Sequence, residues 1–209
     1  MLAVTQPTEL GTCYSLADLR ALAELAHAHR MVLHMDGARL ANAAARLECT
    51  LEEVTVGVGV DALSFGGTKN GLLLGDAFVL FRDPDCDFLR LRKQALQLGS
   101  KMRFLAAQFT TLLAERLWWR NADHANRLAD RLAAGLQGLP GVAMAYPVQA
   151  NGVFAVLPPD AAEQLQDRYG YYFWDQGRSL VRLMCGFDTP PEFVDAFLAD
   201  LGRLVSQPV

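Results

Sequence analysis

Two short apolar runs, each followed by a pair of residues that contains glycine, constrain this sequence more than any other feature. The run at 31–35 ends at the Asp-Gly pair 36–37, and the run at 62–65 ends at the Gly-Gly pair 66–67. Short apolar runs that come after helical segments are typical of buried parallel strands. A third run at 75–81 is the next expected strand. Helices and strands that alternate in this way predict an α/β domain with a mostly parallel sheet.

Helical segments are expected beside these strands. Ser15 and Asp18 resemble a capping box, with Asp in place of the usual Glu, at the start of one helix. Residues 38–47 are helical by composition. Residues 1–11 are instead expected to form a polar loop, because they show no apolar period and end at a glycine.

The second half of the chain has a different pattern. Residues 87–136 are helical by composition, with one expected break at 99–100. Short strands around one helix then predict a small α+β region. These strands are expected at 142–146, 152–157, 171–174 and 180–184. A last helix is expected to begin with Thr189 as its N-cap and to bury Phe193.

Composition and charge exclude several classes of function. Hydrophobic residues make up 52% of the chain, which is ample for a packed core and excludes general disorder. The formal net charge is −4, and no run is rich in Lys or Arg, so a nucleic-acid partner is not expected. No stretch has the unbroken apolar length of a membrane span, and the N-terminus lacks the layout of a signal peptide. A cytoplasmic protein without a membrane partner is therefore expected.

Cysteine and histidine spacing gives no sign of a disulfide framework or a metal site. The cysteines are spread along the chain without a CxxC pair, at Cys13, Cys49, Cys86 and Cys185. This spread favours reduced and buried thiols. His27 and His29 lie two residues apart on an expected helix, so they project to different faces and are not expected to bind a metal ion together.

Two reactive side chains follow neighbouring expected strands. Asp36 comes at the end of one strand and Lys69 comes shortly after the next. Open α/β sheets build their sites at the carboxyl ends of strands. A carboxylate that keeps a pyridine nitrogen protonated, and an amine that forms a Schiff base, are what a pyridoxal phosphate site requires. Taken singly, an Asp-Gly pair is most often a turn and a lysine in a glycine-rich loop is most often solvated, so these alternatives stay open here.

Six segments of the chain together resemble one family. HMDGARLANAAA and VDALSFGGTKNGL closely resemble segments of the low-specificity L-threonine aldolases, which have the aminotransferase-like pyridoxal phosphate fold. The other segments are QPTELGTCYSL, RKQALQLGSKMRFLAAQ, ANGVFAVLP and VRLMCGFDTP. They follow in the family's order over nearly the whole chain. The resemblance implies that residues 1–122 are the C-terminal part of a cofactor-binding large domain, and that residues 123–209 are a small C-terminal α+β domain.

The resemblance also implies roles for individual residues. Lys69 resembles the lysine that holds pyridoxal 5'-phosphate, and Asp36 resembles the partner of the pyridine nitrogen. Arg39 matches a contact to the phenolic oxygen of the ring. Thr68 is a further expected contact to the phosphate, and Arg103 matches an arginine that reaches toward the phosphate, often that of a neighbouring subunit.

The activity implied by the resemblance is the retro-aldol cleavage of L-threonine or L-allo-threonine to glycine and acetaldehyde. By this resemblance, Arg182 in the VRLM segment matches the arginine that binds the substrate carboxylate. Arginine suits this role because its planar fork can bind a carboxylate bidentately. Without this resemblance, Arg182 would be interpreted as a charged surface residue at the end of a strand. The family also implies a homodimer or homotetramer, since sites in this fold are shared between subunits.

The sequence departs from the family in one respect. The family's chains begin well before QPTELG, and their earlier portion carries the loop that holds the cofactor phosphate and the side chain that stacks on the ring. None of the four histidines stands where the stacking histidine of the family would. The chain is therefore expected to be the C-terminal part of a threonine aldolase. A folded remnant that associates but does not turn over substrate is the alternative.

Overall fold

The computed structural model describes residues 1–83 and 87–206 of the chain. Backbone contacts divide it into two compact units. Unit 1 contains residues 1–6 and 14–120, and unit 2 contains residues 7–13 and 121 onward. No helix in the described ranges is both long and apolar enough to cross a membrane.

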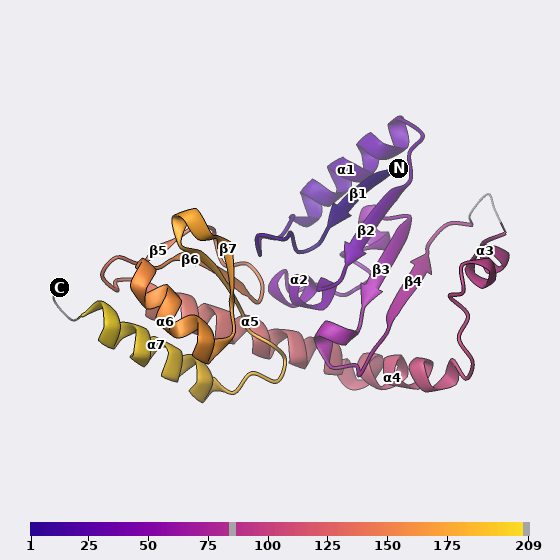
Figure 1. Ribbon diagram of the computed structural model, residues 1–209. Helices are drawn as coiled ribbons and strands as arrows, with labels where there is room; N and C mark the ends of the chain where they lie inside the picture. The colour runs from indigo at the N-terminus through magenta and orange to yellow at the C-terminus, as the bar shows by residue number, and fades with distance from the viewer. Residues whose placement is uncertain (84–86, 207–209) are drawn as a thin grey trace. The chain divides into compact units, whose positions relative to one another are not determined.

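Unit 1 is built on a four-stranded sheet in which the strands lie in the order β1-β2-β3-β4 (Figure 1). The strands are β1 (Leu2–Thr5), β2 (Leu33–Gly37), β3 (Ala62–Gly66) and β4 (Asp76–Leu80). The first three run parallel to one another, and β4, the outermost strand, pairs antiparallel with β3. The predicted α/β class with a mostly parallel sheet is therefore confirmed.

The expectation of a polar loop over residues 1–11 is wrong, because β1 lies within it. The backbone N–H of Leu2 donates to the Val32 carbonyl at 2.9 Å, and that of Gln6 donates to the Asp36 carbonyl at 2.9 Å. A strand of four residues is too short to show a period in sequence, and the hydrogen bonds that define it come from a distant partner strand.

Four helices accompany this sheet, and the large buried side chains of β2 and β3 lie on one of its faces. The helices of unit 1 are α1 (Leu16–Ala28), α2 (Leu40–Arg46), α3 (Phe88–Gln94) and α4 (Arg103–Leu113), with short 3-10 turns at Val56–Val58, Thr68–Asn70 and Ala114–Arg116. The predicted capping box forms at Ser15 and Asp18. Leu33, Met35 and Leu63 are buried on one face of the sheet. His34, Asp36 and Ser64, which alternate with them, are more exposed.

The long helical region has one more break than expected. The chain is non-helical around 99–100, as predicted, but it also breaks between α4 and α5 (Leu117–Leu136). Glu115 and Arg116 have φ values of 50° and 57°, in the left-handed region. Neither residue favours that region, so no sequence signal marks this break.

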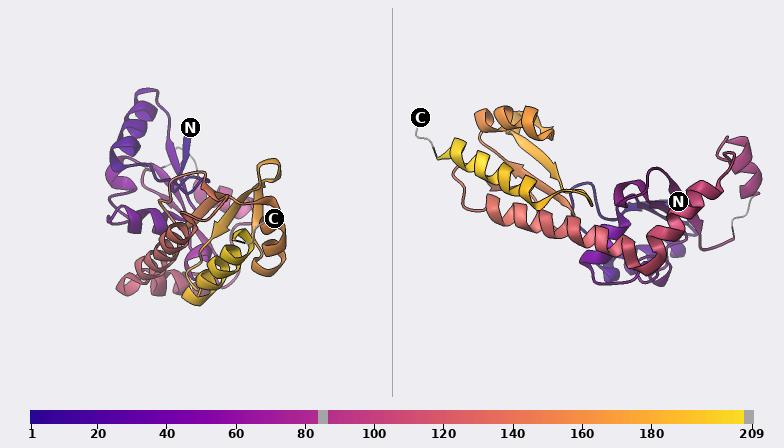
Figure 2. Two further views of the ribbon diagram at one scale, coloured as in Figure 1. Left: turned by 90° about the vertical axis from the view of Figure 1, so that its left-hand side faces the viewer. Right: turned by 90° about the horizontal axis from the view of Figure 1, so that it is seen from below.

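Unit 2 packs a four-stranded antiparallel sheet against helices. Its strands are β5 (Ala143–Met144), β6 (Gly152–Val156), β7 (Tyr172–Asp175) and β8 (Leu180–Met184), in the order β5-β6-β8-β7. The helices α5 from Asn121 onward, α6 (Pro159–Tyr169) and α7 (Pro191–Val205) lie beside this sheet (Figure 2). Their side chains share one apolar core with it. The buried residues Val153, Val181 and Leu183 point into that core.

The start of α7 differs from the prediction by one residue. Pro190 is the N-cap and makes no side-chain cap hydrogen bond. The hydroxyl of Thr189 instead accepts a hydrogen bond from the backbone N–H of Gly186 at 2.7 Å, which closes the preceding turn. Phe193 is 48% exposed rather than buried, and its ring packs edge-on against Tyr169 at 5.2 Å.

The described cysteines are mostly buried, as predicted. Cys49 and Cys185 are buried, and burial raises the pKa of the Cys185 thiol to about 11. Cys13 is half-buried, and its thiol donates to the backbone carbonyl of Gln149 at 3.0 Å. Cys86 lies outside the described residues.

Candidate active site

The carboxyl ends of β2 and β3 meet at one edge of the unit 1 sheet. The two strands are parallel, with Asp36 opposite Ser64 and Gly37 opposite Phe65. Because parallel strands end on the same side, the segments that follow them emerge next to each other. The sheet therefore places the two motifs that carry Asp36 and Lys69 at a single edge.

Asp36 presents its carboxylate at this edge. The side chain is exposed, and its Oδ1 accepts a hydrogen bond from the backbone N–H of Ala38 at 2.9 Å. This hydrogen bond leaves the other carboxylate oxygen, Oδ2, available to a ligand. Arg39 follows at the position directly before α2.

The segment after β3 carries Lys69 on a short 3-10 turn, Thr68–Asn70. Lys69 is exposed, whereas Asn70 beside it is buried and donates through Nδ2 to the Trp118 carbonyl at 3.0 Å. Thr68 accepts a hydrogen bond from the backbone N–H of Gly75 at 3.1 Å. The residues on both sides of Lys69 are therefore anchored, and they limit the positions that its side chain can reach.

Gly66 brings the two segments into direct backbone contact. A Cβ atom at Gly66 would lie 2.7 Å from both the Cα and the carbonyl oxygen of Ala38. Only glycine fits there without a backbone shift. Since Ala38 is two residues from Asp36 and Gly66 is three from Lys69, this contact holds the carboxylate-bearing and amine-bearing segments side by side.

A histidine shares the exposed face of the sheet with Asp36. His34 Nε2 lies 3.0 Å from Ser64 Oγ, and its ring stacks on Phe78 of β4 with centroids 6.1 Å apart. Ser64 is also the residue opposite Asp36 in the strand register. The hydroxyl of Ser64 therefore pairs with His34 in this structure.

Arg103 lies at the start of α4, in a different part of unit 1. Its side chain is exposed and its guanidinium carbon is 6.0 Å from the centre of the Phe104 ring. It borders a groove of about 740 Å³ between β4, α3 and α4. The remaining walls of this groove are mostly apolar and include Phe78 and Phe109.

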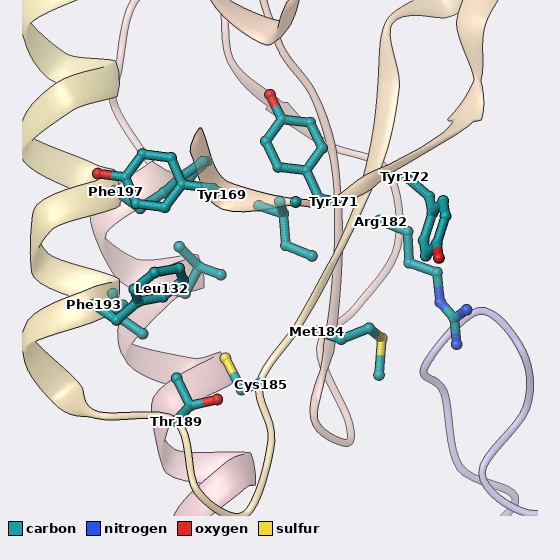
Figure 3. Close-up of a pocket in the computed structure, with 13 residues that line it drawn as sticks. Leu132, Tyr169, Tyr171, Tyr172, Arg182, Met184, Cys185, Thr189, Phe193 and Phe197 are labelled. Atoms are coloured by element: carbon teal, nitrogen blue, oxygen red, sulfur yellow. The ribbon is translucent and has the colours of Figure 1, made fainter. Parts of the chain in front are cut away.

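Arg182 is the one predicted site residue that belongs to unit 2. It lies in the middle of β8 and is half-buried. It also borders a small cavity of about 170 Å³ whose other walls are largely aromatic and apolar (Figure 3). Figure 3 shows Arg182 and Met184 on one side of β8 and Cys185 on the other.

Comparison with known proteins assigns the family. The model of the family described as beta-eliminating lyase matches residues 1–158. The chain belongs to the beta-eliminating lyase family. Among curated proteins of known name, it is 45% identical over 206 residues to the low specificity L-threonine aldolase of Pseudomonas aeruginosa, and 41% identical over 207 residues to that of a Pseudomonas species. The alignments cover 98% and 99% of this chain but only 59% and 60% of those relatives.

A solved structure has the same fold. The structure of Leishmania major threonine aldolase matches with a TM-score of 0.89 at 28% identity, covering 98% of this chain and 60% of that one. This match confirms the aminotransferase-like fold expected from the sequence. The chain spans about 60% of the length of this solved protein, as it does of the two curated relatives.

Sequence reasoning missed the surroundings of the predicted residues. It did not anticipate the contact between His34 and Ser64, or the aromatic rings of Phe154 and Trp174 beside Arg182. Alternation along the strands would have placed His34 on the same face as Asp36, since the two are two residues apart. The rings beside Arg182 depend on how β6, β7 and β8 pair, which no local pattern shows.

Proposed function

We propose that the chain is part of a pyridoxal phosphate-dependent lyase that cleaves L-threonine or L-allo-threonine to glycine and acetaldehyde. The observation that carries the proposal is the backbone contact between Gly66 and Ala38, which places the segments of Asp36 and Lys69 together at the carboxyl edge of the sheet. Family membership and the low specificity threonine aldolases among the relatives support the same chemistry.

The residues present fit the cofactor. An exposed carboxylate with one oxygen not used by Ala38 suits a protonated ring nitrogen, and an exposed amine on the adjoining segment suits a covalent bond to the cofactor aldehyde. When bound, pyridoxal phosphate supplies an electron sink for the negative charge left on the substrate as the aldehyde departs. Asp36 would hold the proton on the ring nitrogen, and this positive charge is what makes the ring an effective sink.

The other predicted residues would bind anions and hydrogen-bond acceptors. Arg39 would contact the phenolic oxygen of the ring, and Thr68 and Arg103 would contact the phosphate. Arg182 would bind the substrate carboxylate through its two Nη atoms. The homodimer or homotetramer, the cytoplasmic location, the domain limits of 1–122 and 123–209 and the amino acid substrate stay predictions with the rest of this assignment.

Turnover and absorbance test the proposal together. With pyridoxal phosphate present, the purified chain should show the absorbance band of a lysine-bound cofactor and should release glycine and acetaldehyde from L-threonine. Lys69→Ala should abolish the band while the fold, measured by circular dichroism, is unchanged. The chain has only two other lysines, Lys93 and Lys101, and both are exposed, so Lys93→Ala and Lys101→Ala are matched controls that should keep the band.

The outcomes separate the two hypotheses. A band that survives Lys69→Ala would show that the assignment of the lysine is wrong. A band at Lys69 without release of glycine would favour the folded remnant, in which the cofactor binds but the substrate does not react. The Asp36→Asn variant should keep the covalent bond to Lys69 and reduce turnover at least about a hundredfold, because an amide does not hold the proton on the ring nitrogen.

A further inference from the structure

Arg182 lies in a row of side chains on the face of the unit 2 sheet that points away from the helices. Phe154 of β6 and Tyr172 of β7 are the residues directly opposite Arg182 on its two neighbouring strands. Residues that are opposite each other in antiparallel strands project to the same face. The core side chains of β8, such as Val181 and Leu183, project to the other face. Arg182 therefore projects to the face that carries these aromatic side chains and not to the face that carries the core side chains of β8.

Two aromatic rings lie against the guanidinium of Arg182. Its guanidinium carbon is 5.9 Å from the centre of the Phe154 ring and 5.8 Å from that of Trp174. The two rings are perpendicular to each other, with centres 5.4 Å apart, and Tyr146 packs edge-on against Phe154 at 5.7 Å. Both distances to Arg182 are within the range in which a cation is attracted to a ring face.

An irregularity in β7 coincides with one of these rings. The register shifts between Phe173, which is opposite Val181, and Asp175, which is opposite Leu180, so Trp174 is the extra residue of a β-bulge. Bulges redirect side chains and are common next to binding sites. The bulge thus explains how Trp174, on the outermost strand, reaches Arg182.

The guanidinium keeps donors that the described residues do not use. Within residues 1–83 and 87–206, no carboxylate lies within ion-pairing distance of Arg182, and its buried Nε has no hydrogen-bond partner. A half-buried arginine is normally paired, because a charge removed from water needs a partner. Aromatic faces attract the cation without using its N–H donors, so the donors stay available to a planar anion.

We propose that Phe154 and Trp174 are positioning residues, whose rings hold the guanidinium of Arg182 in the orientation that binds the carboxylate of the substrate. The inference rests on the proposed function for the identity of that carboxylate. The rings restrict the rotation of the guanidinium, and the carboxylate then binds to an arginine that is already oriented. Removal of either ring should weaken carboxylate binding without removing the charge.

Nuclear magnetic resonance of the arginine Nε–Hε group tests the placement without cofactor or turnover. In the full chain, the Arg182 signal, identified by its loss in Arg182→Lys, should be shifted by the adjacent rings away from the signals of exposed arginines. Trp174→Leu and Phe154→Leu should each move it toward the exposed position. Trp174→Phe and Phe154→Tyr keep a ring and should retain most of the shift. Trp174 is 42% exposed, so its variants should fold even if those of Phe154 do not.

Titration with L-threonine and with L-threoninol, which has a hydroxymethyl group in place of the carboxylate, tests the binding role. The wild-type chain should bind threonine more tightly than threoninol, and Trp174→Leu should reduce its affinity for threonine about fivefold while that for threoninol is unchanged. Tyr146→Leu is the matched control: its ring contacts Phe154 but not the guanidinium, so it should have a smaller effect.

Three results would overturn the inference. An Arg182 signal that does not move in either leucine variant would show that the rings do not hold the guanidinium. A signal that moves while the affinity for threonine is unchanged would leave the rings a structural role only. A wild-type chain that does not prefer threonine over threoninol would show that Arg182 is not a carboxylate site. Absence of cofactor bonding at Lys69 would contradict the proposed function but would leave these measurements valid.

Discussion

The two units place their predicted binding residues by different means. In unit 1, Asp36 lies near the carboxyl end of β2 and Lys69 just past the end of β3, and the backbone contact of Gly66 with Ala38 sets the separation of the two segments. In unit 2, Arg182 lies within a strand, and aromatic side chains set its orientation. The comparison teaches that the unit 1 residues depend on backbone positions that tolerate no added atoms, whereas the unit 2 residue depends on side chains that can be exchanged one at a time.

The largest expected effect comes from adding one methyl group to the backbone contact in unit 1. Gly66→Ala would place Cβ 2.7 Å from two backbone atoms of Ala38, and backbone cannot move aside as a flexible side chain can. We expect a loss of about 3 kcal/mol in the free energy of unfolding, at the upper end of overpacking effects, together with reduced cofactor bonding at Lys69. Urea denaturation followed by circular dichroism measures the first effect.

Gly202→Ala is the matched control in unit 2. Gly202 lies in α7 and has nothing within 4 Å of the position where a Cβ would be. Replacement should leave the chain as stable as before or more stable by up to about 1 kcal/mol, because alanine favours the helix. If both variants have the same midpoint of urea unfolding as the wild type, the Gly66 contact does not constrain the site. The comparison between the units then fails.

The second effect concerns the core of unit 2, which buries titratable groups. Burial raises the pKa of Cys185 from 9.0 to about 11, so the folded chain keeps this proton more tightly than the unfolded chain does. The contribution of this thiol to stability is therefore complete below pH 9 and is lost as the pH rises from about 9 to 11. At pH 11 the loss is about 2 kcal/mol.

Cys185→Ala isolates this contribution. Its free energy of unfolding should fall less than that of the wild type between pH 8.5 and 11, although the variant is less stable than the wild type at pH 8.5 because it has a smaller side chain in the core. The pKa of Tyr171, which burial raises to about 12, adds a further alkaline loss that both chains share. Parallel pH profiles for the two chains would show that the thiol is not buried as the structure has it.

The smallest effect tests whether cofactor bonding at Lys69 is independent of the stability of α1. Ser15 caps α1, and its hydroxyl accepts a hydrogen bond from the backbone N–H of Asp18 at 3.1 Å. Ser15→Ala should lower the free energy of unfolding by about 1 kcal/mol and leave cofactor bonding at Lys69 unchanged. Ser100→Ala, at an exposed position outside the helices, should change neither quantity. Loss of cofactor bonding in Ser15→Ala at full folding would contradict this independence.

The sequence predicted the arrangement in unit 1 better than that in unit 2. Chain order and two apolar runs were enough to place Asp36 and Lys69 at one sheet edge, since parallel strands must end together. Nothing local shows that β1 forms or that Trp174 is the extra residue of a bulge, because both depend on pairing with distant strands. The break at Glu115 and Arg116 likewise has no signal, since those residues rarely adopt a positive φ.

The central claim is that Lys69 is the residue that holds the cofactor, and reductive trapping tests it most directly. The chain is mixed with pyridoxal phosphate, reduced with borohydride and digested, and the mass of each peptide is measured. We predict one pyridoxyl group on the peptide that contains Lys69 and none above background on those that contain Lys93 or Lys101. Equal labelling of all three lysines, or no labelling of Lys69, would contradict the assignment of this edge of the sheet as the cofactor site.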